Sequence, residues 1–561
     1  MKKLVLHALS GIALAVIDVA AFGAAAAAPA AAIVAEPPAA SPVADAAQRR
    51  DFVAVKELLA GKADVNQPQA DGTTALHWAA RWDTLDAARL LIKARADVNA
   101  TTPLGATPLY LAALNGSAPM IELLLSARAD ARRRVLADES TPLMFAARSG
   151  NAESVGLLLK AGADINAAEN YRGTSALMWA AERNNLEVVK LLLAHGANAS
   201  QSSKVTERGT SGKVPARNAA PADPNLAKPQ PAAKASGPKD PQGGLTALIL
   251  AVRENASPVV EALLTAGAPV NQQSGDGSTA LVVAVQNVYL DLAKLLIEHG
   301  ADVNLSNQKG WSPLYLAIKD RSMEYGTMPP PPIDREALLA FIKLLIAKGA
   351  DTNARVKDDT EMRNAIKATW LNEAGATPFL RASLCGDYTV MKLLLEHGAD
   401  PKIPTEDGTT ALAALSGVGF TKGFMQDIEG PETSLRAIKL LIDSGIDVNA
   451  ANKDNVTALH GAAHKNFAAA IQLLVDHGGD LTVVSQRRGT FERSKEFKGN
   501  TVLDWAYGVQ TGGEASIFHP EAVALVEKLL KERNLPLTRF GFTDGGIAGQ
   551  PASVTKTTTA N

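Results

Sequence analysis

Two histidines near the C-terminal end are the first candidates for chemistry. In the stretch His460-Gly-Ala-Ala-His464 the two imidazoles stand at i and i+4, so on a helix they would share one face. This spacing is typical of a zinc metalloprotease, in which a glutamate after the first histidine acts as general base. Gly461 occupies that position, and the local sequence offers no third ligand. We therefore predict no metal site here.

Other patterns that carry chemistry are also incomplete. The glycine-rich stretch from Gly417 to Gly423 fits neither the dinucleotide nor the phosphate-loop spacing and is interpreted as a flexible loop. The sequence has no Gly-x-Ser-x-Gly nucleophile elbow and no cluster of cysteine or histidine ligands. Cys385 is the one cysteine, and it is either a small helix residue or a reactive thiol. We predict no catalytic, cofactor-binding or metal-binding residue.

Composition narrows the class of partner. Of 561 residues, 47% are hydrophobic but only 5% are aromatic, so the core must be built from Ala, Leu and Val. Lys+Arg of 56 against Asp+Glu of 58 gives a net charge of -2. A nucleic-acid-binding protein would show a basic excess, so we expect no nucleic acid as partner.

The N-terminus resembles an export signal. Met1-Lys2-Lys3 supplies a positive start, Leu4 to Ala21 an apolar stretch, and Ala24 to Ala28 small residues suited to cleavage. Asp18 interrupts the apolar stretch, and an uncleaved membrane anchor is the alternative. We expect a signal peptide over residues 1–28, an Ala/Pro-rich linker over 29–43, and a bacterial periplasmic protein or one anchored in the inner membrane.

A recurring tetrad organises the rest of the chain and must position any functional side chain. Thr-Ala-Leu-His at Thr74 is followed by related tetrads, most of them about 33 residues apart, a spacing that indicates repeated units. They begin at Thr107, Thr141, Ser175, Thr246, Thr279, Ser312, Thr377, Thr410, Thr457 and Thr501.

The tetrads, their period and the Ala-Ala pairs that follow them resemble the ankyrin repeat family, roughly from Ala44 to Leu530. This resemblance implies an all-α solenoid of helix-turn-helix units joined by β-turn fingers, with about 11–12 repeats including the two caps. Thr or Ser would cap each first helix, and Gly would end many second helices. Residues 44 to 66 lack the tetrad and resemble an N-terminal cap, whereas the unit at Thr501 has Asp504 in place of His and resembles a C-terminal cap.

The repeat accounts for most of the histidines. His77 and His460 stand in the tetrad, where the family's imidazole links neighbouring units. Four others precede the Gly that ends a second helix, where a partly charged imidazole suits the helix C-terminus: His195, His299, His397 and His477. Only His464 and His519 in the repeats have no such explanation.

Irregular gaps between tetrads mark insertions. We predict two repeat blocks, 44–199 and 243–534, separated by a disordered Pro/Ala/Lys-rich insertion over 200–242 and followed by a disordered tail over 535–561. The insertion carries seven Lys and Arg against three Asp and Glu, and it is either a solvated loop or a docking segment for an acidic partner. Further insertions at 320–334, 355–374, 416–432, 483–496 and 508–519 make the second block less regular.

By resemblance, the residues after each Ala-Ala pair and those before each tetrad point towards a protein partner. These candidates are Arg81, Trp82, Leu114, Asn115, Arg148, Ser149, Glu182, Arg183, Arg253, Glu254 and Trp311. Trp82 beside Arg81 is the chief anchor, because Trp and Arg dominate interface energetics; packing against an adjacent helix is its alternative. Trp78, Trp179 and Trp505 are assigned to packing.

The leading hypothesis is an exported, monomeric, non-enzymatic adaptor that binds an unidentified protein partner through its concave surface. An enzyme or enzyme inhibitor with a site in the irregular region 320–432 is a second possibility, which a cleft with convergent titratable groups would favour. A membrane-anchored structural protein of the cell envelope is the third.

Overall fold

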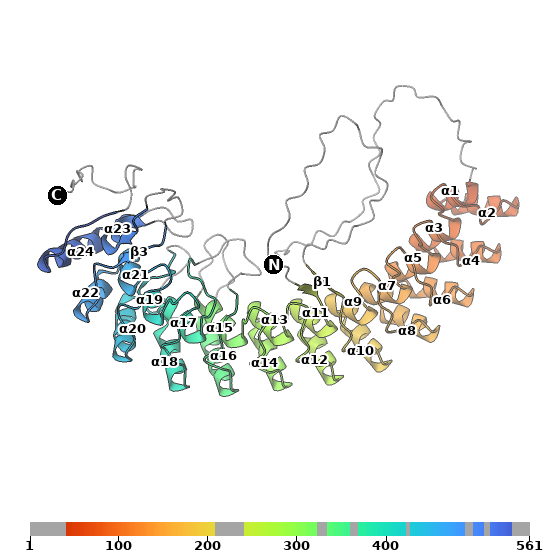
Figure 1. Cartoon of the computed structure of the whole chain (residues 1–561). Coiled ribbons are helices and arrows are strands. Elements are labelled where there is room, and N and C mark those ends of the chain that lie inside the picture. Colours follow the sequence, from red (N-terminus) through yellow and green to blue (C-terminus); the bar gives the residue numbers. More distant parts are fainter. Residues whose placement is uncertain are drawn as a thin grey trace, which may run out of the picture.

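Repeated pairs of helices stack side by side into an arc (Figure 1). The computed structural model describes residues 41–207, 241–322, 334–358, 369–421, 427–488, 497–509 and 517–540, and twelve helix pairs lie within them. The predicted signal and linker, 1–40, lie outside the described residues, as does most of the predicted tail. The all-α solenoid predicted from the tetrads is confirmed.

The first helix of each pair lies on the concave side of the arc (Figure 1). These inner helices are α1 (Pro42–Gln48), α3 (Ala75–Arg81), α5 (Pro108–Asn115), α7 (Pro142–Ser149), α9 (Ala176–Glu182), α11 (Ala247–Arg253), α13 (Ala280–Gln286), α15 (Pro313–Ser322), α17 (Pro378–Leu384), α19 (Ala411–Ser416), α21 (Ala458–His464) and α23 (Val502–Gly508).

The second helix of each pair lies on the convex side (Figure 1). These outer helices are α2 (Phe52–Ala60), α4 (Leu85–Lys93), α6 (Ala118–Ser126), α8 (Ala152–Lys160), α10 (Leu186–Ala194), α12 (Ser257–Thr265), α14 (Leu290–Glu298), α16 (Arg335–Ala347), α18 (Tyr388–Glu396), α20 (Pro431–Asp443), α22 (Ala468–Asp476) and α24 (Pro520–Glu532).

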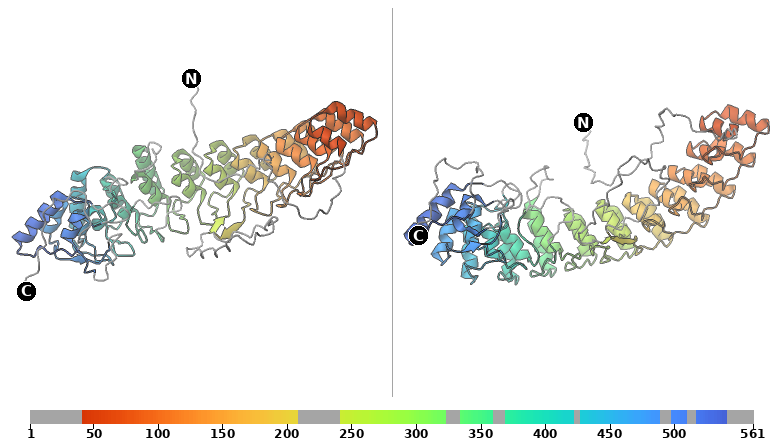
Figure 2. Two further views of the ribbon diagram at one scale, coloured as in Figure 1. Left: turned by 90° about the horizontal axis from the view of Figure 1, so that it is seen from above. Right: turned by 45° about the horizontal axis from the view of Figure 1, so that its top comes forward.

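Small residues set the curvature. Ala79 and Ala80 of α3, like Ala146 and Ala147 of α7, are almost fully buried against the neighbouring inner helices. Because alanine lets helices approach closely, the inner helices pack more tightly on one another than the outer helices do, and the stack bends towards the inner side. Figure 2 shows the turn fingers, the loops between one outer helix and the next inner helix, projecting from one side of the helical stack.

A tetrad threonine or serine stands immediately before each inner helix from α3 to α23, as expected. Thr107 Oγ1 accepts a hydrogen bond from Tyr110 N at 3.1 Å, which satisfies a donor that the first turn leaves free. In α3 the His77 ring accepts from Thr74 N at 3.2 Å and contacts Ala106 O of the next finger at 3.1 Å. The imidazole thus joins two units, as the resemblance implied.

An asparagine ladder also ties the units together. The side chain of Asn66 donates to Arg95 O and accepts from Asp97 N, at 3.2 and 2.7 Å. Asn99, Asn271, Asn304, Asn353 and Asn449 make the same pair of bonds to the next unit. The Ala-Asp-Val-Asn stretch is therefore a bridge between repeats.

The insertion after α10 does not divide the array. Helices α9 and α11 pack directly on each other, as do α10 and α12, so the two predicted blocks are one continuous stack. The expectation of disorder over 200–242 is wrong at both ends, because β1 (Val205–Glu207) pairs antiparallel with β2 (Pro241–Gly243). Residues 208–240 lie outside the described part of the chain.

The contacts of Asp504 in the C-terminal cap explain why its tetrad has aspartate in place of histidine. Asp504 accepts from Thr501 N, as the tetrad histidine does, and its carboxylate also accepts from Phe540 N at 3.0 Å and lies 3.4 Å from Arg539 Nε. The segment after α24 supplies donors where other units supply a carbonyl, so a carboxylate fits and an imidazole would not. Residues 535–540 are thus docked on α23, not part of a disordered tail. A small ladder of β3 (Val484–Ser485) and β4 (Asn500–Thr501) precedes α23.

Candidate protein-interaction surface

The inner surface comprises the exposed faces of the inner helices and the turns that follow them. Its first half, α1–α14, carries ten of the eleven predicted partner residues. Arg81, Leu114, Asn115, Ser149, Arg183, Arg253 and Glu254 are exposed, whereas Trp82, Arg148 and Glu182 are half-buried. Their place on this surface agrees with the prediction, and their binding role stays a prediction.

Trp82 is held by its own chain. Its ring stacks on Trp78 with centroids 5.8 Å apart, and the guanidinium carbon of Arg50 lies 4.0 Å from its ring centroid. The Arg81 guanidinium stands at 5.7 Å. The packing alternative therefore holds for much of this ring, and the exposed group beside it is Arg81.

A second arginine–aromatic group begins two inner helices further on and involves α7 and α9. Arg148 at the end of α7 lies 4.8 Å above the Trp179 ring of α9. Burial and the nearby Arg183 lower the pKa of Arg148, which Glu182 partly offsets. Tyr110 of α5 packs edge-on against Phe145 at 4.7 Å. Burial and then Asp138 raise the pKa of Tyr110, which Arg148 and Arg81 partly offset. Arg81, Tyr110, Arg148 and Arg183 thus follow one another across four consecutive inner helices.

Some predicted residues already serve the scaffold. Asn115 donates its side-chain amide to Ala80 O and Arg81 O, at 3.1 and 2.9 Å, and so closes the C-terminus of α3. The Ser149 hydroxyl donates to Ala146 O. Leu114, Arg253 and Glu254 have no such structural bond among the described residues, and their side chains face solvent.

The prediction for Trp311 is wrong. This side chain is 7% exposed, its Nε1 donates to Asp358 O at 3.1 Å, and Lys319 Nζ lies 4.0 Å from its ring centroid. Asp358 belongs to the lengthened finger 355–374, of which residues 355–358 and 369–374 are described, and its carbonyl lies against the tryptophan. An ordinary short finger would have left the ring exposed, and its length was the only signal in the sequence.

Thr369 and Trp370 of the same finger cover part of the inner surface of the second half, α15–α24. Thr369 Oγ1 donates to Gly419 O at 2.6 Å, and Trp370 Nε1 donates to Phe420 O at 2.9 Å. The Trp370 ring lies 5.7 Å from both the His464 and the Trp505 rings. One insertion therefore reaches from the α17 unit to α21 and α23.

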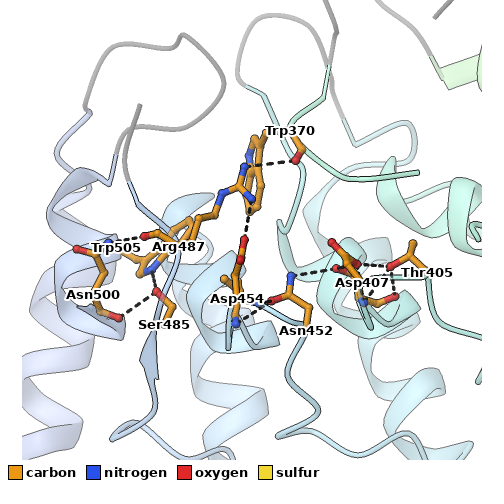
Figure 3. Close-up of polar contacts among 11 residues, drawn as sticks. Trp370, Thr405, Asp407, Asn452, Asp454, Ser485, Arg487, Asn500 and Trp505 are labelled. Atoms are coloured by element: carbon orange, nitrogen blue, oxygen red, sulfur yellow. Dashed lines mark hydrogen bonds and ion pairs between the residues drawn. The ribbon is translucent and has the colours of Figure 1, made fainter. Parts of the chain in front are cut away.

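A chain of polar contacts runs beneath Trp370 along successive fingers (Figure 3). Thr405 donates to Asp407, Asn452 accepts from Asp454 N, and Asp454 receives Arg487 Nη1 at 3.2 Å. The Arg487 guanidinium carbon lies 4.5 Å from the Trp370 ring centroid. The arginine is thus stacked on a tryptophan and paired with a carboxylate of its own chain.

The glycine-rich stretch is packed where the structure describes it. Gly417 has φ of +131°, and a Cβ there would stand 2.3 Å from Gly461 O. A Cβ on Gly461 would in turn stand 2.7 Å from Val418 N. The interpretation of a flexible loop is therefore wrong for 417–421, and Gly461 is explained by this close approach; 422–426 lie outside the described residues.

The two candidate histidines lie in this covered region. Burial lowers the pKa of His460 to about 4, partly offset by backbone carbonyls at Val483 and Asn500. Burial and then the neighbouring His519 lower the pKa of His464 to about 4. His464 packs edge-on against Trp505 at 5.6 Å. In the described residues no group of three or more His, Cys, Asp or Glu is placed to hold a metal ion.

Buried charges in the irregular region 320–432 pair with one another. Glu373 lies 3.0 Å from Arg381 Nη1 and 3.9 Å from Lys319 Nζ, and Arg321 pairs with Asp387. Burial raises the pKa of Asp387, which Arg321 partly offsets. Convergent titratable groups do occur here, but as ion pairs that join α15 to α17 and its finger. Cys385 at the end of α17 is buried, as expected of a small helix residue.

A continuous stack of helix pairs with an extended inner surface defines a solenoid repeat protein. Family models of ankyrin repeats match residues 43–135, 130–203, 248–326, 374–403 and 432–475, together more than half of the chain. The chain belongs to the ankyrin repeat family. Ankyrin repeats generally mediate protein–protein interaction, and proteins built from them are typically scaffolds without catalytic activity.

Similar proteins match parts of the array. The chain is 31% identical over 136 residues to putative ankyrin repeat protein L86 of Acanthamoeba polyphaga mimivirus, covering 24% of this chain and 23% of that protein. It is 32% identical over 117 residues to ankyrin repeat and SOCS box protein 16 of Mus musculus, covering 20% and 24%. The chain thus spans about a quarter of the length of either relative. The crystal structure of the human ASB11 ankyrin repeat domain aligns with 23% identity and a TM-score of 0.36, covering 47% of this chain and 99% of that domain.

Proposed function

We propose that this protein is a non-enzymatic adaptor that binds a protein partner across the first half of its inner surface. One observation carries the proposal: the two halves of that surface differ. In the second half, Trp370 and Arg487 are engaged by the chain itself. In the first half, Arg81 and Arg148 stand beside aromatic rings, and neither they nor Arg183 make an ion pair among the described residues.

A photo-crosslinking amino acid tests the surface in the cells that make the protein. Placed at Arg183 on the inner surface, it should give a discrete adduct that is absent when it is placed at Arg89 on outer helix α4. The adduct should also weaken in the Arg81→Gln/Arg148→Gln double variant, whose thermal transition should change little because neither guanidinium makes an ion pair or a side-chain hydrogen bond among the described residues. Equal adducts at both positions, or an adduct unaffected by the double variant, would remove this surface from consideration.

We further propose that the protein is exported to the periplasm of a bacterium and acts there as a monomer. The basic start, apolar stretch and small residues before residue 29 support export. Within the described residues no helix is both long and apolar enough to cross a bilayer. Mass spectrometry of the purified native protein should find a mature N-terminus near residue 28; an intact Met1 would instead favour an anchored envelope protein.

A further inference from the structure

Arginines at the ends of inner helices in the first half have no paired counter-charge from the described chain, whereas four arginines in the second half do. In the second half Arg321, Arg381, Arg487 and Arg539 each pair with a carboxylate of the chain, respectively Asp387, Glu373, Asp454 and Asp504. In the first half the arginines at the ends of inner helices are Arg49, Arg50, Arg81, Arg148, Arg183 and Arg253. None of these six guanidinium groups makes an ion pair or a side-chain hydrogen bond within the described part of the chain.

The second half also contains an arginine whose ring stacking and charge pairing are both supplied by the chain itself. Arg487 is stacked on Trp370 and receives the Asp454 carboxylate at its edge (Figure 3). Arg148 has the same stacking, 4.8 Å above Trp179, but no carboxylate at its edge. Guanidinium groups stacked on aromatic rings keep their N–H edge free for bidentate contact with carboxylates.

Nearby charge does not fill this role. Glu182 and Glu254 lie beside the row but form no ion pair with it. The insertion 200–242 carries seven basic against three acidic residues. Like charge would repel it from an arginine row. The charge balance therefore calls for an acidic occupant from another molecule.

We propose that the partner presents an acidic segment, extended across α3 to α9, whose carboxylates contact Arg81, Arg148 and Arg183. Tyr110 lies between the first two of these arginines, and Trp179 beneath the second, so aromatic contact supplements the charge pairing. This inference rests on the proposed function and names the chemistry of its partner. Each arginine comes from a different inner helix, which favours a segment that spans several repeats over a single residue in a pocket.

Selection of random peptides tests this chemistry without knowledge of the partner. Displayed peptides are selected on the full chain, and the enriched sequences are synthesised and titrated by fluorescence anisotropy at low and high salt. We expect them to be rich in Asp and Glu and to bind at least about tenfold more weakly to Arg81→Glu/Arg148→Glu/Arg183→Glu. The matched control is Arg89→Glu/Lys160→Glu/Lys392→Glu, with the same charge change on the outer helices, and should bind as the parent does.

The outcomes separate the two proposals. Neutral or basic peptides that lose binding in Tyr110→Ala/Trp179→Ala would overturn the acidic partner and leave the surface standing. Peptides that bind both sets of variants like the parent, or no enrichment at all, would overturn the surface itself. A single-stranded DNA oligonucleotide that displaces the acidic peptides and binds more tightly would assign the arginine row to phosphate and refute an acidic protein segment.

Discussion

Acid should destabilise the C-terminal end of the array before its centre. His460 and His464 are buried in α21, and the pKa of each is lowered to about 4 from the ordinary 6.5, mainly by burial. Around His464 stand the cationic Arg487 and the titratable His519, which oppose its protonation further. Both imidazoles are therefore neutral in the folded protein over a range in which they are charged when unfolded.

The sign and size follow from linkage. Because the folded pKa lies below the unfolded one, the unfolded state binds protons first, so stability is complete above about pH 6.5 and falls as the pH drops towards 4. At about pH 5 each imidazole lowers the free energy of unfolding by about 2 kcal/mol relative to neutral pH. The reduction reaches about 3.4 kcal/mol per imidazole once the pH is below both its folded and its unfolded pKa. These are upper figures for each group, since relaxation and water entry reduce them.

Hydrogen exchange measures this loss unit by unit. Peptides from α21 and α23 should lose protection between neutral pH and about pH 5, after correction for intrinsic exchange, by about 2–4 kcal/mol of opening free energy. Helix α11, which contains no histidine, is the internal reference. His464→Phe should keep the ring contact with Trp505 and remove about half of the pH dependence. Identical pH dependence in α21 and α11, or an unchanged response in the variant, would refute the reasoning.

Two further substitutions probe strain and covering. Val288 has φ of +56° in the turn between α13 and α14, at the position where Asn255 and Asn184 stand in earlier units. Val288→Asn should raise the free energy of unfolding by about 1 kcal/mol, and Asn255→Val should lower it by a similar amount. Thermal melts that show no change in either variant would contradict backbone strain at Val288. Trp370→Ala should destabilise the α21–α23 region by about 3 kcal/mol. Trp370→Phe should have an intermediate effect, because it keeps an aromatic ring and loses the bond to Phe420 O. Unaltered proteolysis of that region in Trp370→Ala would show that Trp370 does not stabilise it.

The features that the sequence predicts well are local. The tetrad threonine caps its helix by accepting a hydrogen bond from the backbone N–H three residues further on, as Thr107 does from Tyr110. Three of the four histidines at the ends of outer helices bond the carbonyl four residues earlier, as in His195 Nδ1 to Leu191 O at 2.9 Å. Such contacts depend only on the spacing within one unit. The Ala-Ala pairs set the approach of neighbouring helices in the same way.

The contacts that could not be predicted from the sequence involve residues far apart in the chain. Nothing near Trp311 indicated that Asp358 would accept from its indole, and nothing near Trp370 indicated that it would meet Trp505. Both contacts involve described residues of the lengthened finger, Asp358 and Trp370, whose partners in other units no local pattern indicates. Tyr110 could not be predicted for another reason: it stands at the fourth tetrad position, which in the α3 unit holds the scaffold residue His77, and only the structure shows it half-buried beside Phe145.

Trp370 connects units of the second half that are not neighbours in the stack. In a solenoid each unit contacts its neighbours, and stability is close to a sum of nearest-neighbour interactions. Trp370 enters from the α17 unit and reaches His464 and Trp505, two and three units further on, so opening α21 or α23 must also break contacts with the α17 finger. Helices α1 to α14 pack from unit to neighbouring unit without such a strap among the described residues. We therefore expect the first half to adjust its curvature to a bound segment in small steps, and the second half to move as one body. This difference is expected if the first half recognises the partner and the second half provides a fixed end.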